Sequence, residues 1–453
     1  MSAIYRFRDL VRWDAFTLPT LPIPAHWPQA RMGDLIVPRK ERVDLAANDF
    51  ASLQLISISF GGHVTRRKVK DGRTYTMALL WARYGDIVLS KIDLKNGAVG
   101  VLNENIEEAA VTTHFAVYTP ILDLLSPAYL KLLIQTGAFK RWLRAARSGA
   151  DGRTEVKLEL FEDLNIPLPP PDEQRTLVAA YHAALTKATA LEAAAATAEA
   201  DGLAAFEAAL GLAAPAPLPD VPRFIARFSA MDRWSHEAVL RQSAGDSSGT
   251  GTYPMVKLRD VVADVRVGVS PRCHPRPREG DSWGVLKLSA VTGGKFKPEE
   301  NKAVKLASDR NAALEIHEGD VLIARGSGIT KFVGAACIVD RPVNGLMLCD
   351  LVFRVEMLAE TPIDNGFLAN VLGIPTVRRQ IESTRTGAAP GIQKTTKKAL
   401  LGLTFPLPTD IAEQRSLIAA LEQERSKAFA LRQKAVAKRA RAWAAFEAAI
   451  YGE

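Results

Sequence analysis

The clearest hydrophobic pattern in the chain is a four-and-three repeat of small and apolar residues that occurs twice. In the first stretch the stripe falls on Leu177, Tyr181, Ala184, Ala188, Leu191, Ala195, Ala198, Gly202 and Ala205. It recurs 240 positions later at Leu417, Leu421, Glu424, Ala428, Leu431, Ala435, Lys438, Ala442 and Ala445. This spacing is typical of a coiled-coil seam. The pattern therefore predicts two long helices whose small seam residues let their backbones approach closely.

Each predicted helix follows a proline-rich extended segment. Asp172 comes directly after Pro171, and Asp410 with Glu413 has the spacing of a capping pair. From Asp172 to Leu210 the first helix would run 39 residues, or about 58 Å at about 1.5 Å per residue. Only a partner helix could bury so long a stripe, so the two helices are predicted to pack against each other.

Shorter landmarks repeat in the same order outside the seams. A Gly-Asp turn that leads into an apolar strand stands at Gly85–Leu89 and again at Gly319–Ile323. The other matched pairs are Ser148-Gly149 with Thr386-Gly387, Ile166–Pro169 with Phe405–Pro408, Glu173–Arg175 with Glu413–Arg415, and Phe206–Ala209 with Phe446–Ala449. The whole chain is thus predicted to be one unit used twice.

The predicted architecture is an α+β fold with two globular domains and two antiparallel coiled-coil helices. The boundaries are residues 1–165 for the first globular domain, 166–218 for the first helical spacer, 219–405 for the second globular domain and 406–453 for the second spacer. With 453 residues, of which 47% are hydrophobic, the chain is long enough for several domains.

The charge of the chain favours an anionic partner such as nucleic acid. The formal net charge is +8, and the sequence pI is about 9.3. The basic excess lies in the predicted globular domains, with 22 basic and 18 acidic residues in 1–165 and 26 and 20 in 219–405. Residues 166–218 instead hold 2 basic and 6 acidic side chains.

The three cysteines, Cys273, Cys337 and Cys349, lack the spacing of a zinc cluster or of a disulfide framework. A reducing cytoplasm is the expected setting. No cleavable leader and no uncharged stretch of about 18 residues is found, so no membrane association is expected.

The sequence indicates no enzymatic site. Asp151, Glu155 and Lys157 resemble the Asp…Glu-x-Lys string of metal-dependent nucleases, but the matching stretch of the repeat, Pro390–Lys397, contains no carboxylate. Gly326–Lys331 does not have the spacing of a P-loop, and no methyltransferase tetrapeptide or glycine-rich loop for a methyl donor is present. We therefore expect no catalytic residues, no metal site and no cofactor.

A globular domain, a Pro-Leu-Pro segment, a Glu-Gln-Arg triplet and a long helix, followed by the same unit again, resemble the specificity subunit of type I restriction-modification enzymes. The resemblance covers essentially the whole chain. Its most specific pieces are Gly85–Ile92, Ser148-Gly149 and the two passages at 167–175 and 406–415.

This resemblance implies two target-recognition domains that each bind one half of a bipartite site in double-stranded DNA. The two helices would hold these domains apart. The implied partners are two modification subunits, which carry S-adenosylmethionine and methylate adenine, and a restriction motor-nuclease subunit that can join them. The specificity subunit itself is non-catalytic.

A DNA reader needs phosphate contacts for position and base-edge contacts for specificity, so candidates are basic and polar residues on glycine-containing loops. In the first domain they are Arg66, Arg67, Lys68, Lys70, Arg73, Lys91, Lys95, Arg147 and Arg153. In the second they are Arg266, Arg272, Arg276, Arg278, Lys295, Lys297, Arg325, Lys331, Arg385, Lys394, Lys397 and Lys398. Gln393 and Asn96 could pair with an adenine edge. For any one of these residues, an ordinary solvated charge is the competing explanation.

Two other functions stay open at this point. The chain could be the DNA reader of a fused restriction enzyme, although the two repeats already occupy its 453 residues. It could also be a non-catalytic coiled-coil scaffold that joins other proteins, although the basic excess of the globular domains favours DNA.

Overall fold

A computed structural model describes residues 19–67, 77–103, 105–148, 155–212, 252–385 and 391–452 of the chain. The chain forms two compact units. Unit 1 comprises Met1–Leu191 and Gln433–Glu453, and unit 2 comprises Glu192–Arg432. The unit boundaries fall inside the two long helices, so each helix contributes one half to each unit.

The centre of unit 1 is a four-stranded antiparallel sheet with the order β2-β9-β6-β7. Its strands are β2 (Ile36–Pro38), β9 (Phe115–Pro120), β6 (Ile87–Ser90) and β7 (Val99–Val101). Four antiparallel strand pairs accompany it: β1 (Gln29–Arg31) with β12 (Asn165–Pro167), β3 (Ile56–Ile58) with β4 (Val64–Arg66), β5 (Leu79–Arg83) with β8 (Glu108–Thr112), and β10 (Arg147–Ser148) with β11 (Glu155–Val156). The short helices are α1 (Pro127–Gln135), α2 (Gly137–Ala145) and α3 (Leu158–Glu162).

Unit 2 has a four-stranded antiparallel sheet with the corresponding order β14-β21-β17-β19. Its strands are β14 (Val262–Val267), β21 (Val352–Met357), β17 (Val321–Ala324) and β19 (Ala336–Ile338). Around it lie β13 (Met255–Lys257) with β23 (Thr404–Pro406), β18 (Gly326–Ser327) with β22 (Gln393–Lys394), and a sheet of β16 (Asn301–Ala303), β15 (Gly284–Leu286) and β20 (Leu346–Met347). The short helices are α6 (Asn365–Val371), α7 (Pro375–Ser383) and α8 (Lys397–Leu401).

The sequence repeat is therefore a repeat of structure, as predicted. Both central sheets have the same strand order, and three short helices follow each sheet in the chain. The repeated Gly-Asp turns have the same backbone conformation, in which Gly85 and Gly319 adopt φ values of 83° and 88°. Glycine reaches this left-handed region without the steric cost that other residues incur. The units differ in their other strands, where unit 1 has the β3–β4 hairpin and unit 2 has the β16-β15-β20 sheet.

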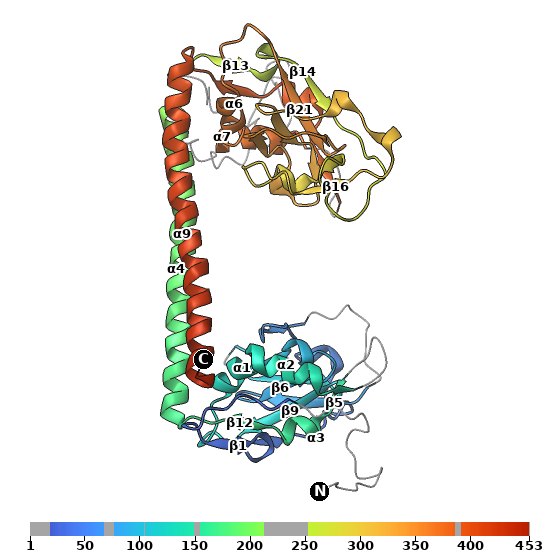
Figure 1. The fold of residues 1–453 in the computed structure, drawn as a ribbon, viewed down its shortest axis with the longest axis vertical. Coiled ribbons are helices and arrows are strands. Elements are labelled where there is room, and N and C mark those ends of the chain that lie inside the picture. Colours follow the sequence, from blue (N-terminus) through green and yellow to red (C-terminus); the bar gives the residue numbers. More distant parts are fainter. Residues whose placement is uncertain are drawn as a thin grey trace, which may run out of the picture. The chain divides into compact units, whose positions relative to one another are not determined.

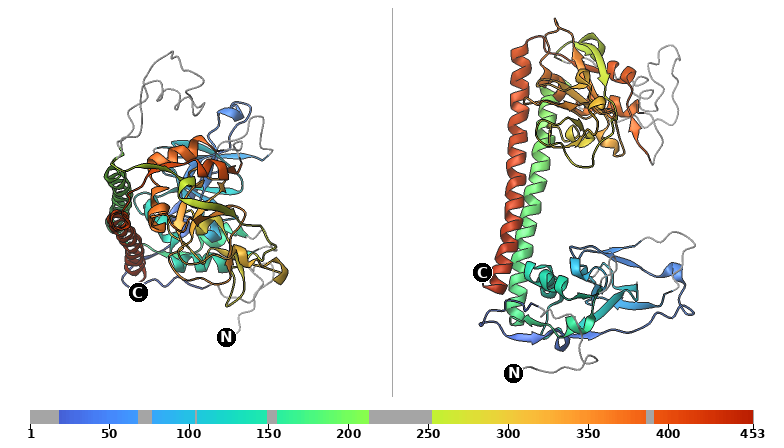
Figure 2. Two further views of the ribbon diagram at one scale, coloured as in Figure 1. Left: turned by 90° about the horizontal axis from the view of Figure 1, so that it is seen from above. Right: turned by 45° about the vertical axis from the view of Figure 1, so that its right-hand side comes forward.

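The predicted helices are α4 (Pro171–Ala209) and α9 (Ile411–Tyr451). Halves of the two helices lie side by side in each unit (Figures 1 and 2). In unit 2, Ala195 and Ala198 pack with Ala428, which is fully buried. In unit 1, the Tyr181 ring lies 5.7 Å from that of Trp443. The predicted pairing of the helices is confirmed.

The seam departs from its predicted phase at one end of each helix. Ala205 and Ala445 are exposed, whereas the next residues, Phe206 and Phe446, are each only 3% exposed. The reason is an added packing partner: both rings contact a globular domain, and the Phe446 ring also lies 6.3 Å from that of Tyr181 on α4. Phe206 lies 6.1 Å from the ring of Phe367 in unit 2, and Phe446 lies 6.3 Å from that of Tyr129 in unit 1.

Two glutamate residues strengthen this docking of the helix ends. Glu447 Oε1 accepts a hydrogen bond from Gly137 N at the start of α2, at 2.6 Å. Its repeat partner Glu207 accepts one from Thr376 N in the first turn of α7, at 2.8 Å. Because the first amides of a helix have no partner within it and carry partial positive charge, both carboxylates stabilise a helix start in the domain on which they dock.

The beginnings of the long helices are anchored by the glutamines of the repeated Glu-Gln-Arg triplets. Gln174 and Gln414 are both fully buried. Gln174 donates from Nε2 to Leu124 O and Pro169 O and accepts at Oε1 from Ser126 N, each at 2.8 Å. Gln414 repeats these contacts with three backbone groups of unit 2: Pro362 O, Pro408 O and Asp364 N. Each glutamine thus ties the first turn of a long helix to the loop before α1 or α6.

Gly202 lies in the seam because the opposite position carries a larger side chain. A Cβ atom at residue 202 would lie 2.9 Å from Cβ of Glu424. At the equivalent positions of the repeat the residues are Ala442 and Ala184, so one pair combines glycine with glutamate and the other uses two alanines.

We expect Gly202→Ala to lower the free energy of unfolding by about 1–2 kcal/mol, because overpacking outweighs the gain in helix propensity. Adding Glu424→Ala removes the obstructing atoms and should restore the parental value or exceed it. Urea unfolding of both single variants and the double variant checks this expectation. Equal destabilisation by Gly202→Ala with and without Glu424→Ala would contradict the close packing.

Candidate nucleic-acid interface

In unit 2, five of the predicted DNA-contacting residues gather around the β18–β22 ribbon. Gly326 pairs with Lys394, and Ser327 pairs with Gln393. Arg325 directly precedes the ribbon, and its carbonyl accepts from Thr395 N at 2.8 Å. The loop that follows β18 contains Lys331, which is exposed. Arg385 reaches this loop and donates from Nη1 to Thr330 O at 3.3 Å. These five residues (Arg325, Lys331, Arg385, Gln393 and Lys394) are called the ribbon cluster below.

Buried polar atoms without a hydrogen-bond partner concentrate at the same place. Across the residues that the structure describes there are five such side-chain atoms, of which four belong to Arg325, Arg378, Gln393 and Thr395. Buried polar groups in folded proteins are nearly always satisfied, so this concentration marks the ribbon cluster as a place where further polar contacts would be favourable. Arg378 and Thr395 were not predicted from the sequence, which holds no motif around either residue.

The remaining lysines of the 394–398 stretch have different surroundings. Lys397 forms an ion pair with Asp264 of β14, and this hydrogen bond lowers the pKa of the Asp264 carboxyl. Lys398 is exposed in the first turn of α8. The charge of Lys397 is therefore already offset within unit 2, whereas that of Lys398 faces solvent.

Several candidates in the N-terminal part of unit 2 are also engaged within the chain. Arg272 lies 3.5 Å from Asp309, and Arg276 lies 2.5 Å from Glu279. Arg278 donates from Nη1 to Ser282 O at 3.1 Å. Lys295 lies 5.9 Å above the Phe429 ring, and Lys297 is exposed. The structure brings none of these five into the ribbon cluster.

The described candidates of unit 1 are spread over three segments. Arg66 and Arg67 are exposed at the end of the β3–β4 hairpin. Lys91 follows β6 and donates from Nζ to Thr113 O at 2.8 Å, and Lys95 is half-buried in the next turn. Asn96 is also half-buried there and donates to Asp93 Oδ1 at 3.5 Å. Arg147 belongs to β10. Lys68, Lys70, Arg73 and Arg153 lie outside the described residues.

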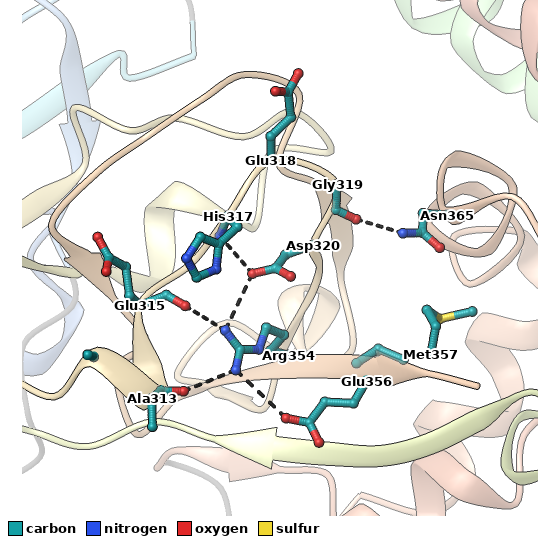
Figure 3. A pocket seen from close by; sticks show the side chains of 12 residues that line it. Ala313, Glu315, His317, Glu318, Gly319, Asp320, Arg354, Glu356, Met357 and Asn365 are labelled. Atoms are coloured by element: carbon teal, nitrogen blue, oxygen red, sulfur yellow. Dashed lines mark hydrogen bonds and ion pairs between the residues drawn. The ribbon is translucent and has the colours of Figure 1, made fainter. Parts of the chain in front are cut away.

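A hollow in unit 2 has an acidic lining and a volume of about 400 Å³. Arg354 lies at its centre, as Figure 3 shows, and donates from Nη1 to Glu315 O at 2.5 Å and from Nη2 to Ala313 O at 3.1 Å. Asp320 and Glu356 lie 3.5 and 3.7 Å from its guanidinium.

Arg266, another predicted DNA contact, lies 2.6 Å from Glu356 at the same hollow. The lining carries four carboxylates, Glu315, Glu318, Asp320 and Glu356, against Arg354 within the lining and Arg266 beside it. A surface with this charge repels phosphate, so the hollow is a poor place for DNA.

No group of three or more His, Cys, Asp or Glu side chains that could hold a metal ion occurs among the described residues. Asp151 of the nuclease-like string lies outside them. The three cysteines are unpaired, and burial raises the pKa of the Cys337 thiol to about 12, so this thiol is a poor nucleophile at neutral pH.

The geometry can be compared with known proteins. A region of 167 residues, 37% of the chain, is 27% identical to the type I restriction enzyme EcoEI specificity subunit of Escherichia coli. The matched region covers only 28% of that relative's length. A chain from a solved type I restriction-modification system matches 95% of this chain over 99% of its own length, with a TM-score of 0.55 and 18% identity.

Over the matched region the sequence is similar to that of a type I specificity subunit, and the fold of the chain is similar to that of a chain from a type I restriction-modification system. The HsdS subunit of Thermoanaerobacter tengcongensis also aligns over 95% of the chain, with 18% identity and a TM-score of 0.43. No family model matches the sequence. Within the described ranges, no helix is both long enough and apolar enough to span a bilayer.

Proposed function

We propose that the chain is the DNA sequence-specificity subunit of a type I restriction-modification complex. The observation that carries this proposal is the duplication, because both units have the same central sheet, short helices and helix anchors but different outer strands and loops. A repeated frame with different loops suits a protein that reads two different half-sites of a bipartite DNA target. The 27% identity with a specificity subunit supports the same function.

In this proposal residues 1–165 and 219–405 are the two target-recognition domains, and residues 166–218 and 406–453 are the helical spacers. The ribbon cluster is the leading candidate for a DNA-contacting surface in the second domain. It combines basic side chains with a glutamine, which can pair bidentately with an adenine edge. Phosphate contacts would position the domain, and base contacts would select the sequence.

The modification subunits, for which we infer two copies, would carry the methyl-transfer chemistry, and a restriction motor-nuclease subunit could join them. We assign no catalytic residue and no cofactor to the chain itself. The exposed faces of α4 and α9 are the proposed docking surface for these partners, because the opposite faces are used by the seam. Three unpaired cysteines fit the reducing cytoplasm in which such a complex would work.

The proposal is tested by a mobility-shift selection on duplexes of random sequence, using the full chain with its modification subunits. A specificity subunit should enrich a bipartite sequence with two different half-sites and a fixed spacer. A coiled-coil scaffold would enrich no sequence. If the chain without partners nicked or methylated DNA when magnesium and S-adenosylmethionine were supplied, the assignment of all catalysis to the partners would be wrong.

We expect DNA affinity to fall steeply with salt, because each neutralised phosphate releases a condensed counterion. The Lys394→Ala, Lys398→Ala double variant should weaken binding to all sequences and reduce the slope of log affinity against log salt by about 2, on the scale of about 0.9 per phosphate contact. The measurement is a salt titration of binding to the selected duplex and to an unrelated duplex.

Lys427→Ala is the matched control, because Lys427 is an exposed lysine on α9 that pairs with Glu424. It removes a positive charge without touching the recognition loops and should leave the slope unchanged. A double variant that kept the parental slope would remove Lys394 and Lys398 from the interface.

A further inference from the structure

The β18–β22 ribbon of unit 2 has one face that glycines leave uncovered. Side chains alternate between the two faces of a strand, and Ser327 is only 4% exposed, so its face is turned into the domain. Gly326 and Gly328, on either side of it in the chain, lie on the other face. A Cβ atom on Gly326 would lie 2.8 Å from Cγ of Lys394 and 3.3 Å from Cγ2 of Ile392. The side chains of Lys394 and Ile392 therefore lie side by side on the outward face.

Gly328 is a glycine that the fold of the chain itself does not require. It does not adopt a positive φ, and a Cβ atom built on it would meet nothing within 4 Å. A glycine in or beside a strand often marks a place where a ligand or another backbone approaches closely. Because no atom of the described chain lies that close to Gly328, the approaching group would belong to a ligand.

Two isoleucines are exposed at the same end of the ribbon. Ile392 directly precedes β22 and is 52% exposed, and Ile329 comes two residues after β18 and is 55% exposed. Because β18 and β22 are antiparallel, the residues that follow one strand lie at the same end as those that precede the other. Single exposed apolar residues are common on proteins. Here two of them flank one ribbon, and one lies against the side chain of a lysine.

The charged side chains next to this end of the ribbon are basic, and contacts within unit 2 place them there. Lys394 belongs to the ribbon itself. Arg385 donates from Nη1 to Thr330 O at 3.3 Å. Arg378 donates from Nη2 to Lys331 O at 2.9 Å. Both arginines therefore reach the loop that directly follows β18, where Lys331 is exposed.

The acidic hollow described above lies at the opposite end of strand β17. Asp320, which directly precedes β17, lines the hollow, whereas Arg325 directly follows the strand and begins the ribbon cluster. The two segments that contain the ribbon and its flanks, residues 321–339 and 391–409, hold no acidic residue. An anionic duplex would therefore approach the ribbon and be repelled from the hollow.

We propose that the β18–β22 ribbon enters the major groove of the bound duplex and that Ile392 contacts the 5-methyl group of a thymine there. The inference rests on the proposed function and names a base contact of the second domain. The major groove is wide enough for a two-stranded ribbon, and the thymine methyl is an apolar group on its floor. The glycine face lets the ribbon come close to the base edges, while Lys394 beside Ile392 contacts a phosphate.

The test uses the full chain with its modification subunits and the duplex selected from the random pool. Each thymine of the two half-sites is replaced in turn by deoxyuridine, which lacks only the 5-methyl group. At one position the parent should bind about four-fold more weakly, the effect of losing one buried methyl group. Ile392→Ala should bind the original duplex more weakly and should no longer distinguish thymine from deoxyuridine at that position.

Three further variants separate a base contact from other roles. Leu306→Ala is the matched control, because Leu306 is an exposed apolar residue of unit 2 outside the ribbon. It should keep the parental affinity and the parental response to deoxyuridine. Because Ile392 carries no charge, Ile392→Ala should keep the parental salt slope, whereas Lys394→Ala should flatten it. Gly328→Ala should leave thermal unfolding unchanged, because the added methyl group meets no atom of the chain, yet weaken DNA binding by holding the ribbon away from the bases.

Three results would overturn the inference: no deoxyuridine substitution weakens binding by the parent, Ile392→Ala keeps the parental response, or Gly328→Ala binds DNA like the parent. Selected half-sites without any A·T pair would overturn it as well. Each of these outcomes leaves the proposed function intact, because the parent complex still selects a bipartite sequence. If the parent complex selected no duplex at all, the proposed function would fail and the inference with it.

Discussion

Replacing Gln414 by leucine is expected to lower the free energy of unfolding by about 3 kcal/mol. Gln414 is fully buried, and its amide satisfies Pro362 O, Pro408 O and Asp364 N at 2.7–2.8 Å. Leucine has a similar size but cannot make hydrogen bonds, so these backbone groups would be left buried without partners. Each such group costs about 1–3 kcal/mol, and relaxation of the loop would recover part of the loss.

A chain of two units need not unfold in one step, so the effect is best measured locally. Hydrogen exchange at the first turns of α6 and α9 should accelerate in Gln414→Leu. Gln174→Leu should produce the same change at α1 and α4, because Gln174 makes the equivalent contacts in unit 1. Gln423→Leu is the control, since Gln423 is an exposed glutamine of α9. Equal exchange rates in Gln414→Leu and Gln423→Leu would refute the anchoring role.

For the two glutamines, the sequence predicted the position in the repeat but not the structural role. Repetition identified the Glu-Gln-Arg triplets as landmarks, and the helix predicted for residues 172–210 differs by one residue at each end from α4. The physical role of the glutamines was not visible, because their partners lie about 50 positions earlier in the chain. Only the fold brings the loop before α1 or α6 to the start of a long helix.

The seam was predicted well because it depends on local spacing. The prediction is in error only at one end of each helix. A four-and-three pattern assumes that the same partner helix continues along the whole stripe. At Ala205 and Ala445 this assumption fails, because the buried position moves to the following phenylalanine, which packs on a globular domain. Sequence periodicity alone cannot show where a helix also begins to pack on a globular domain.

The surroundings of the candidate DNA-contacting residues were harder to predict than the helices. Counting basic residues placed Lys397, Arg272 and Arg276 among the candidates, but each forms an ion pair within unit 2. Conversely, the ribbon cluster brings Arg385, Gln393 and Lys394 to residues 325–331 through contacts that no local pattern indicates. Which charges face solvent depends on contacts between distant segments, and the sequence does not determine these without the fold.

Introducing a carboxyl group into the seam should have the largest effect on stability. Ala428 is fully buried and packs with Ala195 and Ala198. Ala428→Asp places an unpaired charge between two closely spaced helices, which should lower the free energy of unfolding by about 3–5 kcal/mol. The site is more sensitive than Leu431, which is only half-buried. Ala188→Asp should act equally in unit 1, because Ala188 is the repeat partner of Ala428 and is also fully buried.

The pH dependence of this loss distinguishes a buried charge from simple overpacking. Burial disfavours the ionised form, so the pKa of the introduced carboxyl in the folded chain should be raised above its unfolded value of about 3.9. The folded state then binds more protons than the unfolded state between these two values, and its stability falls as the pH rises through this window. The full penalty is present above the raised pKa and shrinks as the pH falls towards 4.

Ala430→Asp is the matched control, because Ala430 is exposed on the same helix. Urea unfolding of both variants between pH 4 and 8 should therefore show a difference between their free energies of unfolding that widens as the pH rises. A constant gap would point to steric overpacking, and no gap at any pH would mean that Ala428 does not lie in a packed seam.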